Sequence, residues 1–253
     1  MEEKKFTIGD AFKYGFNTFI NHFRTLGLGF LAAAVTYIIV FLLWLIFAGL
    51  LLLQFYPEFI RIFATSNLSP ILLILYAKSS TTVFIMLFNY LLVLFVYYGL
   101  LGGFIKLCLN IYDTGKGKVS DIFSSLNITP KLWAAGVLYT LIAIGWLVLL
   151  PPNFLIRQLW TVGSPIIVVG LIFLGIPSIY LAIRFTLVAY FIVDKNTSII
   201  EAFRNSYKAT TGHFLEIFII ELIIAFLSLI PIGSLILTFF WPIIFTYIYR
   251  KLA

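Results

Sequence analysis

Four residues in the second half of the chain have side chains that could do ion or proton chemistry inside an apolar environment: Arg184, His213, Glu216 and Glu221. Arg184 belongs to the apolar run 165–192, and both glutamates belong to the run 214–230. An ionised side chain in hydrocarbon costs about 2.5–3.5 kcal/mol on insertion scales, so it marks an ion or proton pathway, a headgroup site or a buried ion pair. These four residues are therefore our candidate intramembrane polar site.

Arg184 and Glu221 are expected to form an ion pair. Arg184 lies ten residues before Asp194, where its apolar run ends. Glu221 lies eight residues after His213. At 1.5 Å of helix rise per residue, the two charges are about 15 Å and about 12 Å from the ends of neighbouring spans, at nearly the same level. Because arginine suits a bidentate contact with a carboxylate, the pair is either a structural lock between two spans or part of a polar cavity for an ion, a proton or a headgroup.

Glu216 is expected to act separately from Glu221. Five residues of α-helix rotate a side chain by about 140°, so the two carboxylates do not face one site. Glu216 is only three residues from His213 and can reach interfacial water or a basic side chain.

The sequence lacks the motifs of common catalytic sites. Gly115-Lys-Gly-Lys118 has neither the upstream glycine nor the Ser/Thr of a phosphate-binding loop, and no Gly-x-Ser-x-Gly or His-Glu-x-x-His is present. The two histidines, His22 and His213, each precede an apolar run, which favours a structural role over metal binding. The single cysteine, Cys108, lies between leucines and is expected to be a small buried hydrophobe. We therefore predict no enzyme, no cofactor and no metal site.

The composition indicates a membrane protein. The 253 residues are 62% hydrophobic and 11% charged, with a mean hydropathy of +1.09. Soluble domains are about 45–50% apolar and about 25% charged, so lipid is the expected solvent. The net charge of +7 comes from basic residues scattered between apolar runs, which fits membrane topology better than nucleic-acid binding.

Six segments are apolar enough to cross a bilayer, which requires about 20 residues of helix. They are 27–54, 83–109, 132–150, 165–192, 214–230 and 233–249. The sequence Pro231-Ile-Gly233 predicts a tight turn between the last two. In the connection 55–81, the apolar run Pro70–Tyr76 is too short to span and is expected to lie at the interface or to cap the bundle.

The basic residues predict the orientation. Of the 17 Lys and Arg residues, only Arg61, Lys78 and Arg157 lie on one side of the predicted spans. Lys/Arg-rich loops remain in the cytoplasm, so both termini are expected there, in a multi-pass protein of the cell membrane. The start of the chain, Met1–Phe6, has no signal-peptide pattern.

A repeated pattern precedes the membrane hairpins. Thr7–Phe23 resembles Ser198–Phe214, and Val119–Ser124 is a weaker third copy. Thr7 with Asp10, and Ser198 with Glu201, predict capping boxes at helix starts. The apolar residues of the first two copies recur at helical spacing: Phe12, Phe16, Phe19, Phe23, Phe203, Tyr207 and Phe214. We expect a single transmembrane domain of three pseudo-repeats, about 6–109, 118–192 and 197–250, each opening with a cytoplasmic amphipathic helix.

These basic and aromatic helices have two interpretations. One is anchoring, in which Phe enters the acyl boundary and Lys meets anionic headgroups. The other is docking of a cytoplasmic partner or bending of the bilayer. The small residues of Gly99-Leu-Leu-Gly-Gly103 permit close helix approach, either within the bundle or in a homo-oligomer.

Several segments together resemble a known family. They are Phe6–Gly15, Gly99–Lys106, Tyr180–Phe185 and Phe191–Phe214. They are similar to the membrane domain attached to some bacterial glycerophosphodiester phosphodiesterases and to its free-standing relatives. The resemblance implies a bacterial or archaeal polytopic membrane protein in which Arg184 and Glu201–Ser206 match recurrent positions. It does not imply phosphodiesterase activity, which belongs to a separate soluble barrel.

The sequence as a whole predicts an all-α protein with six transmembrane helices as three hairpins, and no enzymatic activity. The leading functional hypothesis is a membrane scaffold or accessory that organises lipid or a partner protein at the cytoplasmic face. The second is a small transporter or channel with a polar site at Arg184 and Glu221, and an enzyme acting on lipid headgroups is a distant third.

Overall fold

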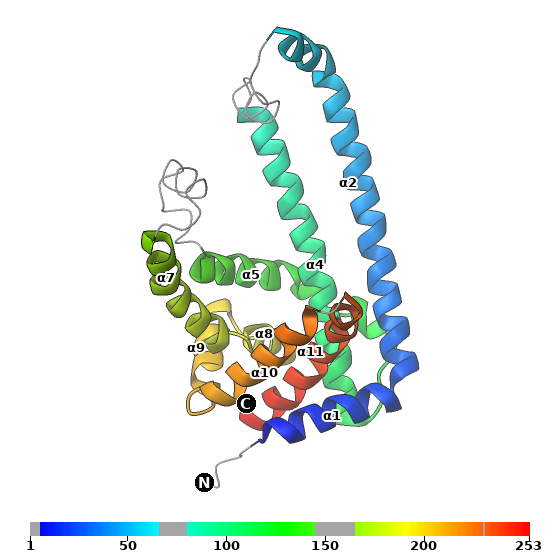
Figure 1. Cartoon of the computed structure of the whole chain (residues 1–253). Coiled ribbons are helices and arrows are strands. Elements are labelled where there is room, and N and C mark those ends of the chain that lie inside the picture. Colours follow the sequence, from blue (N-terminus) through cyan, green and yellow to red (C-terminus); the bar gives the residue numbers. More distant parts are fainter. Residues whose placement is uncertain (1–5, 66–79, 145–164, 230) are drawn as a thin grey trace. The chain divides into compact units, whose positions relative to one another are not determined.

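The structure is a computed structural model that describes residues 6–65, 80–144, 165–229 and 231–253 (Figure 1). In these residues the regular structure is entirely helical, which confirms the all-α prediction. The elements are α1 (Ile8–Asn21), α2 (Phe23–Thr65), α4 (Ser80–Thr114), the 3₁₀ helices η1 (Val119–Phe123) and η2 (Leu126–Ile128), α5 (Thr129–Ile144), α7 (Pro165–Arg184), α8 (Val188–Lys195), α9 (Ile199–Ala209), α10 (Phe214–Ser228) and α11 (Pro231–Leu252).

The chain divides into two compact units. One comprises Met1–Phe30 with Tyr98–Ala253, and the other is Leu31–Tyr97, which contains most of α2 and α4. Helix α2 continues to Thr65, so the first part of the predicted connection 55–81 is helical. The predicted interfacial run Pro70–Tyr76 lies outside the described residues.

Three segments of the described residues are long and apolar enough to cross a membrane. They are Phe23–Ile46, Leu91–Thr114 and Gly175–Lys195. The pair α9 and α10 would be a fourth if it counts as one span, although the two helices meet at 101°. Three or four helices of the described residues are therefore apolar enough to cross a membrane, which is consistent with a membrane protein.

The predicted span 165–192 has a local break, because α7 ends at Arg184 and α8 begins at Val188, within the single apolar segment Gly175–Lys195. One predicted detail is wrong. The residues Pro231–Gly233 are not a turn but the first residues of α11. Proline is well suited to the first position of a helix, where the N–H that it lacks would have no intrahelical partner.

Helix α1 has Thr7 as its N-cap residue, which is one half of the predicted capping box. The Asp10 N–H donates to Thr7 Oγ1 over 3.1 Å, and the Thr7 hydroxyl donates to the Asp10 carboxylate over 2.7 Å. Helix α9 starts in the same way, with the Glu201 N–H donating to Ser198 Oγ over 3.4 Å. Each helix thus has a side-chain cap that satisfies one of its free amides.

Helix α1 packs on α11 through small residues. Ala11, Gly15 and Thr18 form its buried face. A methyl group on Gly15 would lie 2.8 Å from Ile244 Cγ1, so the glycine permits this close approach. On the same side of α1, burial raises the pKa of the Tyr14 phenol to about 12.

The third predicted amphipathic helix is not an α-helix. Residues Val119–Phe123 form the 3₁₀ helix η1, which packs on α4 with Ile122 fully buried. Asp121 accepts hydrogen bonds from the Asn110 side chain (3.0 Å) and from the Lys118 N–H (2.9 Å). Because Asp121 caps its own turn and binds α4, the segment lies against the protein as a short connector.

The core of the larger unit forms around α8 and α11. Its largest fully buried side chains in these helices are Tyr190, Phe245 and Tyr249. The Tyr190 hydroxyl donates to the Pro242 carbonyl over 3.0 Å, so a polar group buried between the two helices is satisfied.

Candidate functional site

The end of α7 is held by a serine of α9. The Ser206 hydroxyl donates to the Arg184 carbonyl over 2.8 Å and accepts from the Leu187 N–H over 3.3 Å. Ser206 is fully buried and replaces hydrogen bonds that the interrupted helix lacks. Phe203, one turn earlier, packs edge-on against Phe185 at 4.8 Å between ring centroids. Helix α9 therefore runs back alongside α8, and its last turn lies beside Arg184.

The Arg184 guanidinium lies among three aromatic rings. Its Cζ atom is 4.9 Å from the centroid of Tyr207, 5.1 Å from Tyr180 and 5.7 Å from Phe214. Tyr180 is one helical turn before Arg184 in α7, whereas the other two rings come from α9 and α10. Cation–π contacts of this kind stabilise the charge by about 0.5–2 kcal/mol each and fix the plane of the guanidinium.

The donors of Arg184 are only partly used. Nη1 donates to Thr211 Oγ1 over 3.4 Å, and Nε is shielded and has no hydrogen-bond partner among the described residues. The hydroxyls of Tyr180 and Tyr207 are 3.4 Å apart, and both side chains are exposed, at 36% and 43%. The cluster thus combines a cation with hydroxyl groups at the protein surface.

The predicted Arg184–Glu221 ion pair is wrong: among the described residues, the Glu221 carboxylate contacts other groups. Its Oε1 accepts hydrogen bonds from Thr186 Oγ1 and from Trp241 Nε1, both over 3.3 Å. The donors are neutral, and Thr186 occupies the break between α7 and α8. Arg184 and Glu221 therefore belong to two separate polar groups.

His213 and Glu216 lie at the start of α10 and do not join Glu221. His213 is the N-cap residue; its ring packs against Phe6 at 5.5 Å, and its shielded Nδ1 has no partner in the part of the chain that the structure describes. Glu216 lies half-buried in the first turn of the helix. Of the four predicted site residues, none is therefore hydrogen-bonded to another in the described structure.

The predicted interfacial residues divide between core and surface. Phe16 (56% exposed), Phe23 (61%) and Tyr207 reach the surface. Phe203 is 8% exposed and belongs to the core. The remaining three, Phe12, Phe19 and Phe214, are half-buried.

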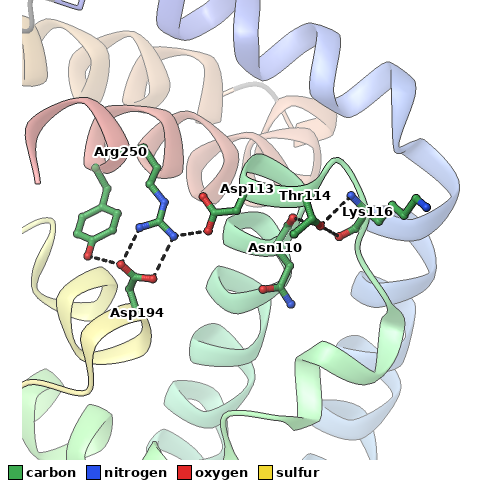
Figure 2. A network of polar contacts seen from close by, with 7 residues as sticks. Asn110, Asp113, Thr114, Lys116, Asp194 and Arg250 are labelled. Carbon is green, nitrogen blue, oxygen red and sulfur yellow. Dashed lines mark hydrogen bonds and ion pairs between the residues drawn. The ribbon is translucent and has the colours of Figure 1, made fainter.

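The sequence analysis did not identify an ionic cluster that joins α4, α8 and α11 (Figure 2). Arg250 donates to the two oxygens of Asp194, over 2.7 and 3.0 Å, and also to Asp113. The Tyr249 hydroxyl donates to Asp194 over 2.8 Å. Burial alone would lower the pKa of the Arg250 guanidinium, but its bonds to Asp194 and Asp113 hold that pKa above its usual value.

Only some of the contacts of Arg184 and Glu221 could have been predicted from the sequence. Tyr180, four residues before Arg184, is a helical neighbour and could have been assigned to the arginine. Thr211 and Trp241 lie in other elements, and no spacing relates them to Arg184 or Glu221. Among the described residues, no group of three or more His, Cys, Asp or Glu side chains could hold a metal ion.

Comparisons with known proteins give no match: no family model, no curated protein and no solved structure corresponds to the chain. The resemblance to the membrane domain of glycerophosphodiester phosphodiesterases therefore remains a prediction from short segments.

Proposed function

We propose that this chain is a non-enzymatic multi-pass membrane protein that organises anionic lipid at the cytoplasmic face of the cell membrane. In this proposal the six predicted spans form three hairpins, both termini are cytoplasmic, and α1 and α9 lie in the bilayer interface. A protein partner or a second copy would bind the same face.

The proposal rests on the exposed apolar and basic side chains of α1 and α9. On α1, Phe16 and Ile20 are each 56% exposed and lie beside the exposed Lys13. On α9, Ile200 is 73% exposed, and the exposed basic residues are Arg204 and Lys208. Apolar and basic side chains on one short helix are typical of interfacial helices, which bury the former and bind anionic headgroups with the latter.

The test measures lipid enrichment around the protein. In vesicles, energy transfer from the five tryptophans to dansyl-labelled phosphatidylglycerol should exceed that to dansyl-labelled phosphatidylcholine. Four exposed cations lie on α1, on α9 and at the start of α2: Lys13, Arg24, Arg204 and Lys208. Because each contributes about 1 kcal/mol near an anionic surface, replacing all four with Gln should remove most of the preference.

A parallel variant keeps the charges and replaces Phe16 and Ile20 with Ser, which should reduce transfer to both lipids alike. Equal transfer to the two lipids in the unmodified protein, at low salt as well as high, would contradict the proposal.

A small transporter or channel remains the second candidate, favoured by one observation. Glu221 is a half-buried carboxylate whose described partners are the neutral donors Thr186 and Trp241. Such a group in a membrane helix is suited to a proton or cation.

Cysteine labelling separates the two candidates. In a Cys108→Ala background, Ala225→Cys places a thiol one turn beyond Glu221, at an exposed position of α10. The scaffold predicts no reaction with a membrane-impermeant maleimide, while a Ser124→Cys control reacts. Labelling of residue 225 from either side of oriented vesicles would instead favour a water-filled path.

A further inference from the structure

The contacts between α9 and Arg184 show how deep Arg184 would lie in a membrane. The last turn of α9 lies beside Arg184, because Thr210 and Thr211 of the following turn contact its carbonyl and its guanidinium. Lys208, which is exposed, is therefore close to the same level. Since an exposed lysine or arginine in hydrocarbon costs about 2.5–3.5 kcal/mol, this level belongs to the headgroup layer and not to the middle of the membrane.

An arginine at that level needs an anion. No carboxylate within the described residues pairs with Arg184, and Glu221, the predicted partner, is bound to Thr186 and Trp241. Glu216, the nearest acidic residue in sequence to the Phe214 ring, forms no ion pair among the described residues either. The rings of Tyr180, Tyr207 and Phe214 hold the guanidinium in place, so its free N–H groups are ordered before an anion arrives.

The groups around Arg184 match a phosphate. Guanidinium and hydroxyl donors converge from Arg184, Tyr180 and Tyr207, and phosphate oxygens accept strong charge-assisted bonds from such donors. The Thr211 hydroxyl accepts from Arg184 and donates to the Tyr207 carbonyl, so it helps to position the guanidinium. The neighbouring surfaces are apolar and exposed: Ile176 (63%) and Ile179 (51%) on α7, and Leu215 (66%) on α10. In a lipid, the phosphate would accept hydrogen bonds from the donors around Arg184, and the acyl chains would cover the exposed apolar side chains.

We propose that Arg184, with the hydroxyls of Tyr180 and Tyr207, binds the phosphate group of a membrane lipid. The site rests on the proposed function, because α9 must lie at the bilayer surface for a lipid to reach it. It adds a single specific site to the diffuse attraction of α1 and α9 for anionic headgroups.

The test is a native mass spectrometry titration of the delipidated protein in detergent. Three probes separate the ligand's parts: dioleoyl phosphatidic acid, dioleoylglycerol without phosphate, and glycerol 3-phosphate without acyl chains. We expect phosphatidic acid to bind in one-to-one ratio, and Arg184→Gln to weaken its binding about tenfold or more, because a charge-assisted bond is lost. Lys116→Gln, which removes an exposed cation that lies outside α1, α7 and α9, should change the affinity less than about twofold.

Tyr180→Phe tests whether a loss of binding comes from the site and not from misfolding. It keeps the ring that holds Arg184 and removes only a surface hydroxyl, so it should fold and still weaken phosphatidic acid binding several-fold. Glycerol 3-phosphate bound as tightly as phosphatidic acid would assign the same site to a soluble phosphate. Equal losses in Arg184→Gln and Lys116→Gln, or dioleoylglycerol bound as tightly as phosphatidic acid, would overturn the proposal.

The titration and the vesicle experiment can fail independently. The first uses no bilayer and leaves α1 unchanged, whereas the second alters four exposed cations and leaves Arg184 intact.

Discussion

Gly103→Ala is expected to destabilise the protein by about 3 kcal/mol. Gly103 lies in α4 directly beneath η1, and a Cβ there would overlap the backbone carbonyl of Ile122 and lie 2.6 Å from its Cα. A backbone cannot rotate away as a side chain can, and η1 is also bound to α4 through Asp121. Relief would require the whole 3₁₀ turn to shift. The measurement is the unfolding of the detergent-solubilised protein in dodecyl sulfate, followed by circular dichroism.

Gly27→Ala is the matched control. It is also a helical glycine, in α2, but a Cβ at this position meets no atom within 4 Å. Because alanine favours a helix over glycine by about 1 kcal/mol, this variant should be neutral or slightly more stable. If both alanine variants unfold at the same denaturant concentration, the close contact between α4 and η1 is not formed in the protein.

The same glycines resolve a question that the sequence left open. Gly99 and Gly103 were compatible with packing inside the bundle or in a homo-oligomer. In the structure, a Cβ on Gly99 would meet Thr129 at 2.9 Å, so both glycines face their own chain. The small-residue pattern correctly indicated a close approach, but it could not identify the partner, because η1 and the start of α5 lie 19 to 30 residues further along the sequence.

The apolar runs and the caps predicted most of the helices, since these signals are local. Ser198 with Glu201 predicted the start of α9. The amphipathic pattern could not show which face of α9 meets protein, so the burial of Phe203 was missed.

The prediction of an Arg184–Glu221 pair was wrong for a related reason. Helix rise gives the position of a residue along the helix axis. It gives neither the direction in which the side chain points nor the packing of α9 beside α8. The residues that do pair with Arg250 lie 56 and 137 positions away, and no spacing rule connects them.

The ionic cluster at Arg250 provides the second large effect, through Asp194. This carboxylate lies near the C-terminus of α8, where the helix dipole disfavours a negative charge, so its position depends on compensation from elsewhere. Arg250 donates two hydrogen bonds to Asp194 in a bidentate contact, and the Tyr249 hydroxyl donates a third. The Asp194 side chain is only 17% exposed. Asp194→Asn keeps the shape but loses the charge that holds Arg250, so we expect a loss of about 2–3 kcal/mol in the same unfolding assay.

Asp113→Asn separates this effect from simple loss of a surface ion pair. Asp113 contacts the same guanidinium, but its side chain is 43% exposed and the other carboxylate remains in place. Exposed pairs contribute about 0–1 kcal/mol and are screened by salt, so this variant should cost less than about 1 kcal/mol, and nothing measurable in 1 M NaCl. The cost of Asp194→Asn should persist at that salt concentration, because its bonds are largely shielded. Equal costs for the two variants would mean that Arg250 does not discriminate between its carboxylates, and that the cluster is a surface network and not the connection that holds α8 to α11.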